Sequence, residues 1–70
     1  MNYLIKFDFT CSKSGHFKGK SGEVSITTES PVSIHEIEKS DVVKTMIAND
    51  MASRTGMSVL SIDITSVQEI

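Results

Sequence analysis

Hydrophobic and polar residues alternate along the first segment of the chain. One side of this segment carries apolar or aromatic residues and the other is mostly polar: Tyr3, Ile5, Phe7, Phe9 and Cys11 against Leu4, Lys6, Asp8 and Thr10. A period of two is typical of a half-buried strand. Because three of the four aromatic residues lie here, we expect this strand to form the centre of the core.

A glycine-rich link and a second alternating run follow. Residues 12–22 contain three glycines with serine and lysine between them, which is typical of a flexible connection. Residues 23–28 alternate again, and Pro31 ends this second strand because proline donates no hydrogen bond to a sheet. Two such runs predict an antiparallel hairpin. If the strands extend into the link, Phe17 returns to the edge of the core.

The segment after Pro31 offers two helix starts. Ser33 and Glu36 have the S-x-x-E spacing of a capping box. Ser40 and Asp41 supply an N-cap with an acidic residue in the first turn. Helical periodicity favours the second start, because it gathers one broad apolar stripe from Val42, Val43, Met46, Ile47 and Met51.

The main helix is therefore predicted over about residues 40–54, with Arg54 in its last turn and Gly56 just past its end. Residues 33–39 form either a short turn of helix or an irregular docking segment. Residues 57–65 alternate a third time and predict a third strand with Leu60, Ile62 and Ile64 on its apolar face, followed by a short tail.

These elements predict an α+β fold, a two-layer β-β-α-β sandwich in one domain over residues 1–70. One helix covers one face of a three-stranded sheet of order 2-1-3. Strand 3 is parallel or antiparallel depending on which neighbour it joins, and beside strand 1 a right-handed crossover permits it to run parallel. We expect the following residues to be mostly buried: Phe7, Phe9, Val24, Ile26, Val43, Ile47, Leu60, Ile62 and Ile64.

Composition narrows the class of protein. Seventy residues suffice for one domain, the net charge is −2, and a single cysteine excludes an internal disulfide. No apolar run is long enough to span a membrane, and the first residues lack the basic stretch and long apolar run of a signal peptide. We therefore expect a cytoplasmic protein.

Residues 15–21 are similar in composition to a nucleotide-binding P-loop, G-x-x-x-x-G-K-S. The segment has one residue too few between Gly15 and Gly19, and that spacing decides whether the backbone amides surround a phosphate. A P-loop also lies between a strand and a helix, whereas this segment is predicted between two strands. The pattern favours an ordinary hairpin connection over a nucleotide site.

Cys11, His16 and His35 are the remaining candidates for reactive or metal-binding side chains. Cys11 and His16 lack a third orienting group, and Cys11 is in phase with the aromatic face, which favours a buried structural thiol. The spacings of 5 and 19 residues match no common zinc signature. We expect no catalytic residue, no cofactor, no bound metal and no enzymatic activity.

Charge is distributed unevenly along the chain. Residues 1–22 carry a net charge of +3 and residues 23–70 a net charge of −5. The basic part contains a candidate binding loop that could contact phosphates and stack on a base: Lys13, His16, Phe17, Lys18 and Lys20. The acidic part contains a candidate interaction face near the helix: Glu36, Glu38 and Asp41. Solvated surfaces are the ordinary interpretation of both.

The layout resembles that of small phage- and plasmid-type accessory proteins. The shared outline is a strand, the aromatic-containing glycine link at residues 15–19, a second strand, the proline turn at residues 30–33, a helix and a last strand at residues 59–64. The resemblance implies binding to a host-factor or defence-system protein by occluding its surface. It carries over no functional residue.

We therefore expect a small non-enzymatic module that binds a protein partner, for example as an inhibitor that occludes its surface, with nucleic-acid binding by residues 13–20 as the alternative. A homodimer through a sheet edge is a further hypothesis, with a monomer whose edges are twisted as the ordinary alternative. Strands 2 and 3 are the predicted edges, and both lack the usual guarding residues within residues 23–28 and 57–65. Strand 3, with only Asp63 inside it, is the favoured edge.

Overall fold

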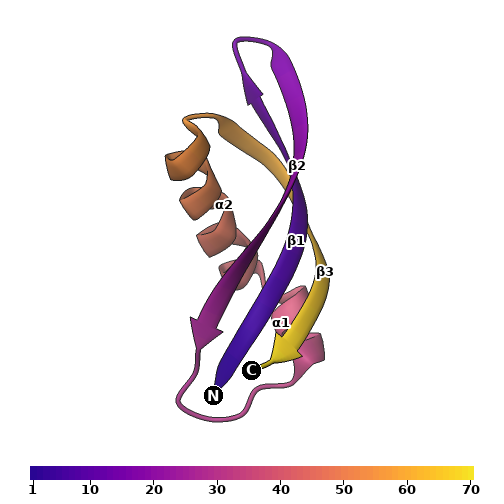
Figure 1. Cartoon of the computed structure of the whole chain (residues 1–70), viewed down its shortest axis with the longest axis vertical. Coiled ribbons are helices and arrows are strands. Elements are labelled where there is room, and N and C mark those ends of the chain that lie inside the picture. Colours follow the sequence, from indigo (N-terminus) through magenta and orange to yellow (C-terminus); the bar gives the residue numbers. More distant parts are fainter.

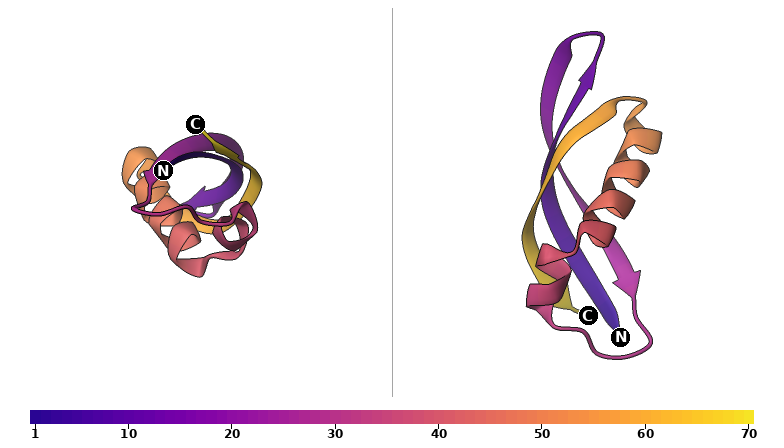
Figure 2. Two further views of the ribbon diagram at one scale, coloured as in Figure 1. Left: turned by 90° about the horizontal axis from the view of Figure 1, so that it is seen from below. Right: turned by 180° about the vertical axis from the view of Figure 1, so that it is seen from behind.

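The computed structural model describes residues 1–70 as three long strands and two helices (Figure 1). In chain order the elements are β1 (Asn2–Lys13), β2 (His16–Thr27), α1 (Ile34–Lys39), α2 (Asp41–Thr55) and β3 (Ser58–Glu69). The sheet has the order β2-β1-β3, and both helices pack on one of its faces (Figure 2). The predicted α+β class and strand order are confirmed, but two helices cover the sheet instead of one.

The β1–β2 hairpin is longer and tighter than predicted. Only Ser14 and Gly15 separate the strands, and both have positive φ, at 53° and 81°. Two such residues make a type I′ turn, whose twist matches that of the flanking strands. The prediction of a flexible link over residues 12–22 is therefore wrong for nine of these eleven residues, which pair between β1 and β2, and the alternative that the strands extend into the link is confirmed.

The structure also decides the direction of β3, which the sequence left open. β1 pairs antiparallel with both neighbours, so β3 is antiparallel to β1 and parallel to β2. The parallel pairing with β1 that a right-handed crossover permits is not formed, because the helical segment connects β2, and not β1, to β3. The helices therefore return the chain to the end of the sheet at which β2 begins, and β3 starts there (Figure 1).

Two bulges interrupt the pairing of β3 with β1. The register moves from Thr10 opposite Ser61 to Cys11 opposite Val59, which leaves Leu60 without a partner, and Thr65 is left out in the same way. One extra residue shifts the side-chain alternation by one position. Leu60 is consequently 56% exposed, and its predicted burial is wrong.

The helices begin and end largely where the sequence indicates. The hydroxyl of Ser40 accepts a hydrogen bond from the Val43 amide at 3.2 Å, and Gly56 has a left-handed φ of 67°. α1 is a separate six-residue helix, which decides between the alternatives for residues 33–39. The capping box is not formed, because the Ser33 side chain makes no capping hydrogen bond.

The core lies between β1 and the helices. Eight residues are buried, and the β1 face predicted from its alternation supplies the first five: Tyr3, Ile5, Phe7, Phe9, Cys11, Ile37, Ile47 and Met51. The predicted burial of Phe7, Phe9 and Ile47 is confirmed. The other predicted core residues pack only partly buried against this cluster, because they lie on edge strands or at the helix margin: Val24, Ile26, Val43, Ile62 and Ile64.

The apolar stripe of α2 is narrower than predicted. Ile47 and Met51 point into the core, whereas Val42 is 80% exposed and Met46 is 47% exposed. The connection before α1 is held by Tyr3, whose hydroxyl donates to the Val32 carbonyl at 3.1 Å and accepts from the Val32 amide at 2.9 Å. This pair of bonds fixes the segment between β2 and α1 over the end of β1.

The resulting molecule is elongated, with extents of 41 × 18 × 18 Å. The turn of the β1–β2 hairpin projects beyond the C-terminal end of α2 (Figures 1 and 2). Neither helix has the length and apolar character needed to cross a membrane.

Candidate functional site

Three lysines of the predicted binding loop share one face of the hairpin. In the β1–β2 register, Lys18 lies opposite Cys11 and Lys20 lies opposite Phe9. Next to the turn, Lys13 lies opposite His16 and is two residues from Cys11 in the same strand. Residues directly opposite each other in an antiparallel pair point to the same side of the sheet. Because Phe9 and Cys11 point into the core, the lysines and His16 lie on the helix side, which we call the basic arm: Lys13, His16, Lys18 and Lys20.

Phe17 does not belong to the basic arm. It pairs with Ser12 on the opposite side of the sheet and is 69% exposed. The structure therefore splits the candidate loop, and Phe17 neither returns to the core edge nor lies beside the lysines. The cause is the regular alternation of β2, which begins at His16.

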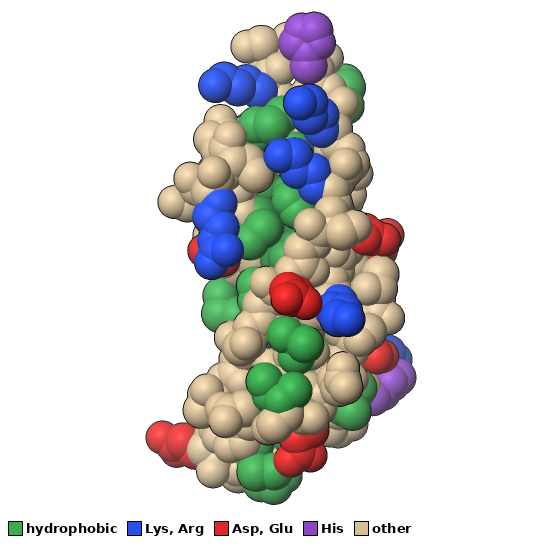
Figure 3. All heavy atoms as spheres, viewed as in Figure 1, with side chains coloured by type: hydrophobic (Ala, Val, Ile, Leu, Met, Phe, Trp, Pro, Cys, Tyr) green, Lys and Arg blue, Asp and Glu red, His purple; other side chains and the backbone are tan.

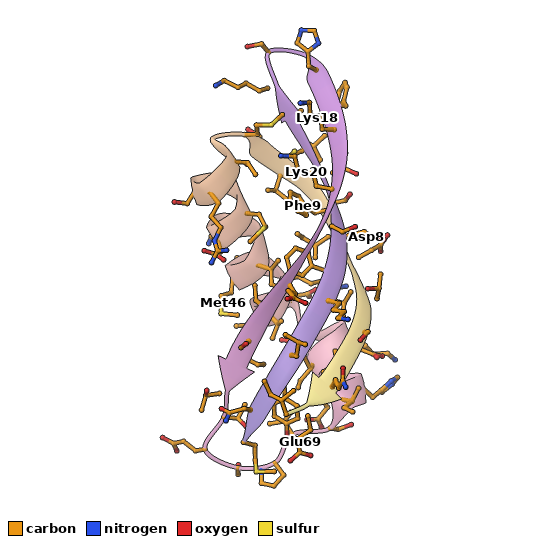
Figure 4. The ribbon with its side chains drawn as sticks, viewed as in Figure 1. Asp8, Phe9, Lys18, Lys20, Met46 and Glu69 are labelled. Carbon is orange, nitrogen blue, oxygen red and sulfur yellow. The ribbon has the colours of Figure 1, made fainter.

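The lysines of the basic arm have no carboxylate partner. The one ion pair in the structure joins Arg54 and Asp50 on α2, at 3.3 Å. Figure 3 shows blue side chains gathered around apolar atoms at the hairpin end of the molecule, with red side chains in the middle and lower parts. In Figure 4, Lys18 and Lys20 extend from β2 toward the side on which α2 lies. The arm thus presents unpaired positive charge beside the helix.

A groove runs between β2 and α2, below the basic arm. It has a volume of about 400 Å³ and is lined by Glu23, Val24, Ser25, Met46, Ile47, Asp50 and Arg54. The groove exists because α2 packs closer to β3 than to β2. Three of its residues stand one helical turn apart on α2, so Met46, Asp50 and Arg54 form the wall that faces the strand.

The β2 edge of this groove carries unpaired backbone groups. Met1 and Thr28 exchange two backbone hydrogen bonds, of 2.6 and 2.8 Å. Because such pairs alternate along an antiparallel ladder, the even-numbered residues of β2 bond to β1. The amides and carbonyls of the odd-numbered residues therefore point to the open edge: Phe17, Gly19, Ser21, Glu23, Ser25 and Thr27.

The predicted acidic face is not a single surface. Glu36 and Glu38 are exposed on α1, but residues two apart on a helix point in different directions. Asp41 is exposed in the first turn of α2, where its negative charge interacts favourably with the positive end of the helix dipole. These three carboxylates lie at the helix end opposite the basic arm, and Asp41 has a structural role that needs no partner.

Cys11, the candidate for a reactive thiol, is part of the core. Cys11 is fully buried, as predicted, and its Sγ lies 3.6 Å from the Lys18 carbonyl oxygen and 3.6 Å from the Met57 sulfur. No group of three or more His, Cys, Asp or Glu side chains is arranged to hold a metal ion. Residues 15–21 are Gly15 of the turn and the first six residues of β2, so this segment lies within the hairpin and not between a strand and a helix as a P-loop does.

Sequence reasoning missed both the groove and a polar hollow on the other face of the sheet. In that hollow Asp8 lies directly opposite Asp63, and the Ser21 hydroxyl donates to Asp8 Oδ1 at 2.6 Å. Like charges in opposite positions are mildly destabilising. The pairing depends on the β3 register, which no pattern in the sequence reveals.

No protein-family model, curated protein or solved structure matches this chain. The geometry of the groove and of the basic arm is therefore what supports a function.

Proposed function

We propose that this protein is a non-enzymatic module that binds a partner protein by accepting an extended segment of it at the β2 edge. The observation that carries the proposal is the row of outward amides and carbonyls from Phe17 to Thr27, next to a groove of mixed apolar and polar lining. An added strand would continue the sheet and place alternate side chains in the groove. A segment held in this way is no longer accessible to other proteins, and this occlusion is how so small a protein would inhibit its partner.

β2 is better suited to this role than β3. Its register with β1 is regular over the whole strand, whereas β3 carries the two bulges at Leu60 and Thr65. Bulges bend and twist a strand and so disturb pairing along its free edge. The groove also lies on the β2 side, where Met46 offers a flexible and half-exposed apolar surface.

Ser25→Pro tests this proposal. The Ser25 amide points to the open edge, so proline removes a donor that the incoming strand needs but no bond to β1. Immobilised wild type captures partner proteins from a nuclease-treated native lysate, and we expect immobilised Ser25→Pro to capture about tenfold less of them. The reason is that a lost hydrogen bond that leaves a buried acceptor without a donor costs about 1–3 kcal/mol.

Ser25→Thr, which keeps the amide, is the matched control and should capture as the wild type does. A thermal unfolding curve for each variant confirms that the fold is retained. Equal capture by Ser25→Pro and wild type would contradict strand addition at this edge.

Nucleic-acid binding is a second candidate function, and the alignment of three lysines on the basic arm favours it. Phe17 on the opposite face removes the aromatic platform for base stacking, and the chain as a whole is acidic. Capture that disappears after nuclease treatment would support this second function over the first.

A further inference from the structure

We propose that the β2 edge selects an acidic–apolar segment, in which carboxylates alternate with polar residues at one end and apolar residues alternate with polar residues at the other. This inference rests on the proposed strand addition and adds the chemistry of the partner. It follows from the change in character of the inward side chains along β2: Lys18, Lys20, Gly22, Val24 and Ile26.

The base of β2 favours apolar side chains in the partner. Val24 and Ile26 are only partly buried and pack against the core. Val24 lines the groove together with Met46, which is 47% exposed, and Ile26 lines a neighbouring hollow with apolar residues of the connection and the helices. Side chains of an added strand opposite Val24 and Ile26 would lie in the layer of α2 and cover these residues. Apolar residues at alternate positions gain most from this burial.

The hairpin end of β2 favours carboxylates in the partner. Lys18 and Lys20 point to the same side as Val24 but lie beyond the groove, and neither forms an ion pair within the chain. An added strand places a residue directly beside each of them, at a distance that allows cross-strand ion pairs. The odd-numbered side chains of β2 lie on the face away from the helices and are mostly small and polar: Gly19, Ser21, Ser25 and Thr27. The residues of the partner that lie beside them therefore remain in water.

A second copy of this chain does not meet these requirements through β2. The inward face of β2 contains no carboxylate, so a paired copy leaves Lys18 and Lys20 without partners. A nucleic-acid strand supplies phosphates for the lysines but has no peptide amides and carbonyls to pair with the β2 edge. It also lacks apolar side chains at alternate positions that would cover Val24 and Ile26. An acidic–apolar peptide satisfies the edge, the groove and the arm together.

Labelled synthetic peptides of about nine residues test the inference, since this length spans Lys18 to Ile26. The acidic probe has glutamates at two alternate positions followed by valines at the remaining alternate positions, with threonine between them. The basic probe has lysines in place of the glutamates. Both are made in the two chain directions, and binding is followed by fluorescence anisotropy at low salt.

We expect the wild type to bind the acidic probe about fivefold more tightly than the basic probe, the effect of two largely exposed ion pairs. The double variant Lys18→Glu with Lys20→Glu should reverse this preference. The matched double variant Lys39→Glu with Lys44→Glu makes the same change in net charge on the helices and should keep the wild-type preference.

The outcomes separate this inference from the proposed function. Equal binding of the two probes, abolished by Ser25→Pro, would overturn the acidic–apolar specificity and leave strand addition intact. Binding that Ser25→Pro does not change would overturn strand addition. Tighter binding of an oligothymidine than of the acidic probe, lost in the Lys18→Glu and Lys20→Glu variant, would assign the basic arm to nucleic acid and overturn the inference.

Discussion

The position of Phe7 in the core depends on the absence of a side chain at Gly22. These residues are directly opposite each other, and a Cβ atom at Gly22 would lie 2.9 Å from Cζ of Phe7. The ring therefore lies against the bare backbone of β2. Gly19, in the same strand, has no heavy atom within 4 Å of the corresponding point.

This contrast predicts opposite effects of one substitution at two glycines. Gly22→Val should lower the free energy of unfolding by about 1–3 kcal/mol, because the added atoms overpack the core at Phe7. Gly19→Val should change it by less than about 0.5 kcal/mol, as expected for an open surface position. Urea unfolding of both variants measures the difference. Equal effects of the two substitutions would show that Phe7 does not pack over Gly22.

At the scale of elements, the free edge of β2 predicts an alternating pattern of amide hydrogen exchange. Even-numbered amides from Lys18 to Ile26 donate to β1 and should exchange slowly, whereas the odd-numbered amides face solvent and should exchange rapidly. Residue-resolved exchange by NMR measures this pattern. Binding of the acidic probe should then slow the odd-numbered amides. Uniform protection along β2 in the free protein would contradict the assignment of the open edge.

Local signals in the sequence predicted most of the elements but not their exact pairing. The alternation in β1, the Ser40 cap and Gly56 act through neighbouring residues, so they can be seen in the sequence. The bulge at Leu60 cannot, because it is a property of how β3 pairs with β1, and it places Val59 instead of Leu60 on the core face. The hairpin turn had its signal in Ser14 and Gly15, but the glycines that follow in β2 obscured it.

The candidate site was predictable in part for the same reason. Lys18 and Lys20 are two residues apart in a strand and must share a face, and a two-residue turn places Lys13 on that face as well. This alternation also excludes Phe17 from the basic arm. The groove depends on the position of α2 over the sheet, closer to β3 than to β2, and the sequence contains no local signal for that placement.

For the whole molecule, the observed length of β2 changes the expectation of a homodimer. The sequence placed this strand at residues 23–28, without an internal charge, but it begins at His16 and so includes Lys18, Lys20 and Glu23. Charges within an edge strand guard it against pairing with a copy of itself. β3, the edge favoured from the sequence, is disturbed by its two bulges. Both edges are therefore better protected than the sequence indicated.

We consequently expect the isolated protein to remain a monomer of 7.7 kDa in sedimentation equilibrium over about a hundredfold range of concentration. The triple variant Lys18→Thr, Lys20→Thr and Glu23→Thr removes the charges from the β2 edge and should self-associate, since strand-forming residues then line an unguarded edge.

The matched variant changes two lysines and one glutamate on the helices, namely Lys39→Thr, Lys44→Thr and Glu38→Thr, and should remain monomeric at the same net charge. A wild-type mass that rises with concentration would show that the edge charges do not prevent self-pairing. If the β2 triple variant stayed monomeric, the twist of the sheet and not its charge would be what keeps copies apart. The lysines would then serve only the choice of an acidic partner.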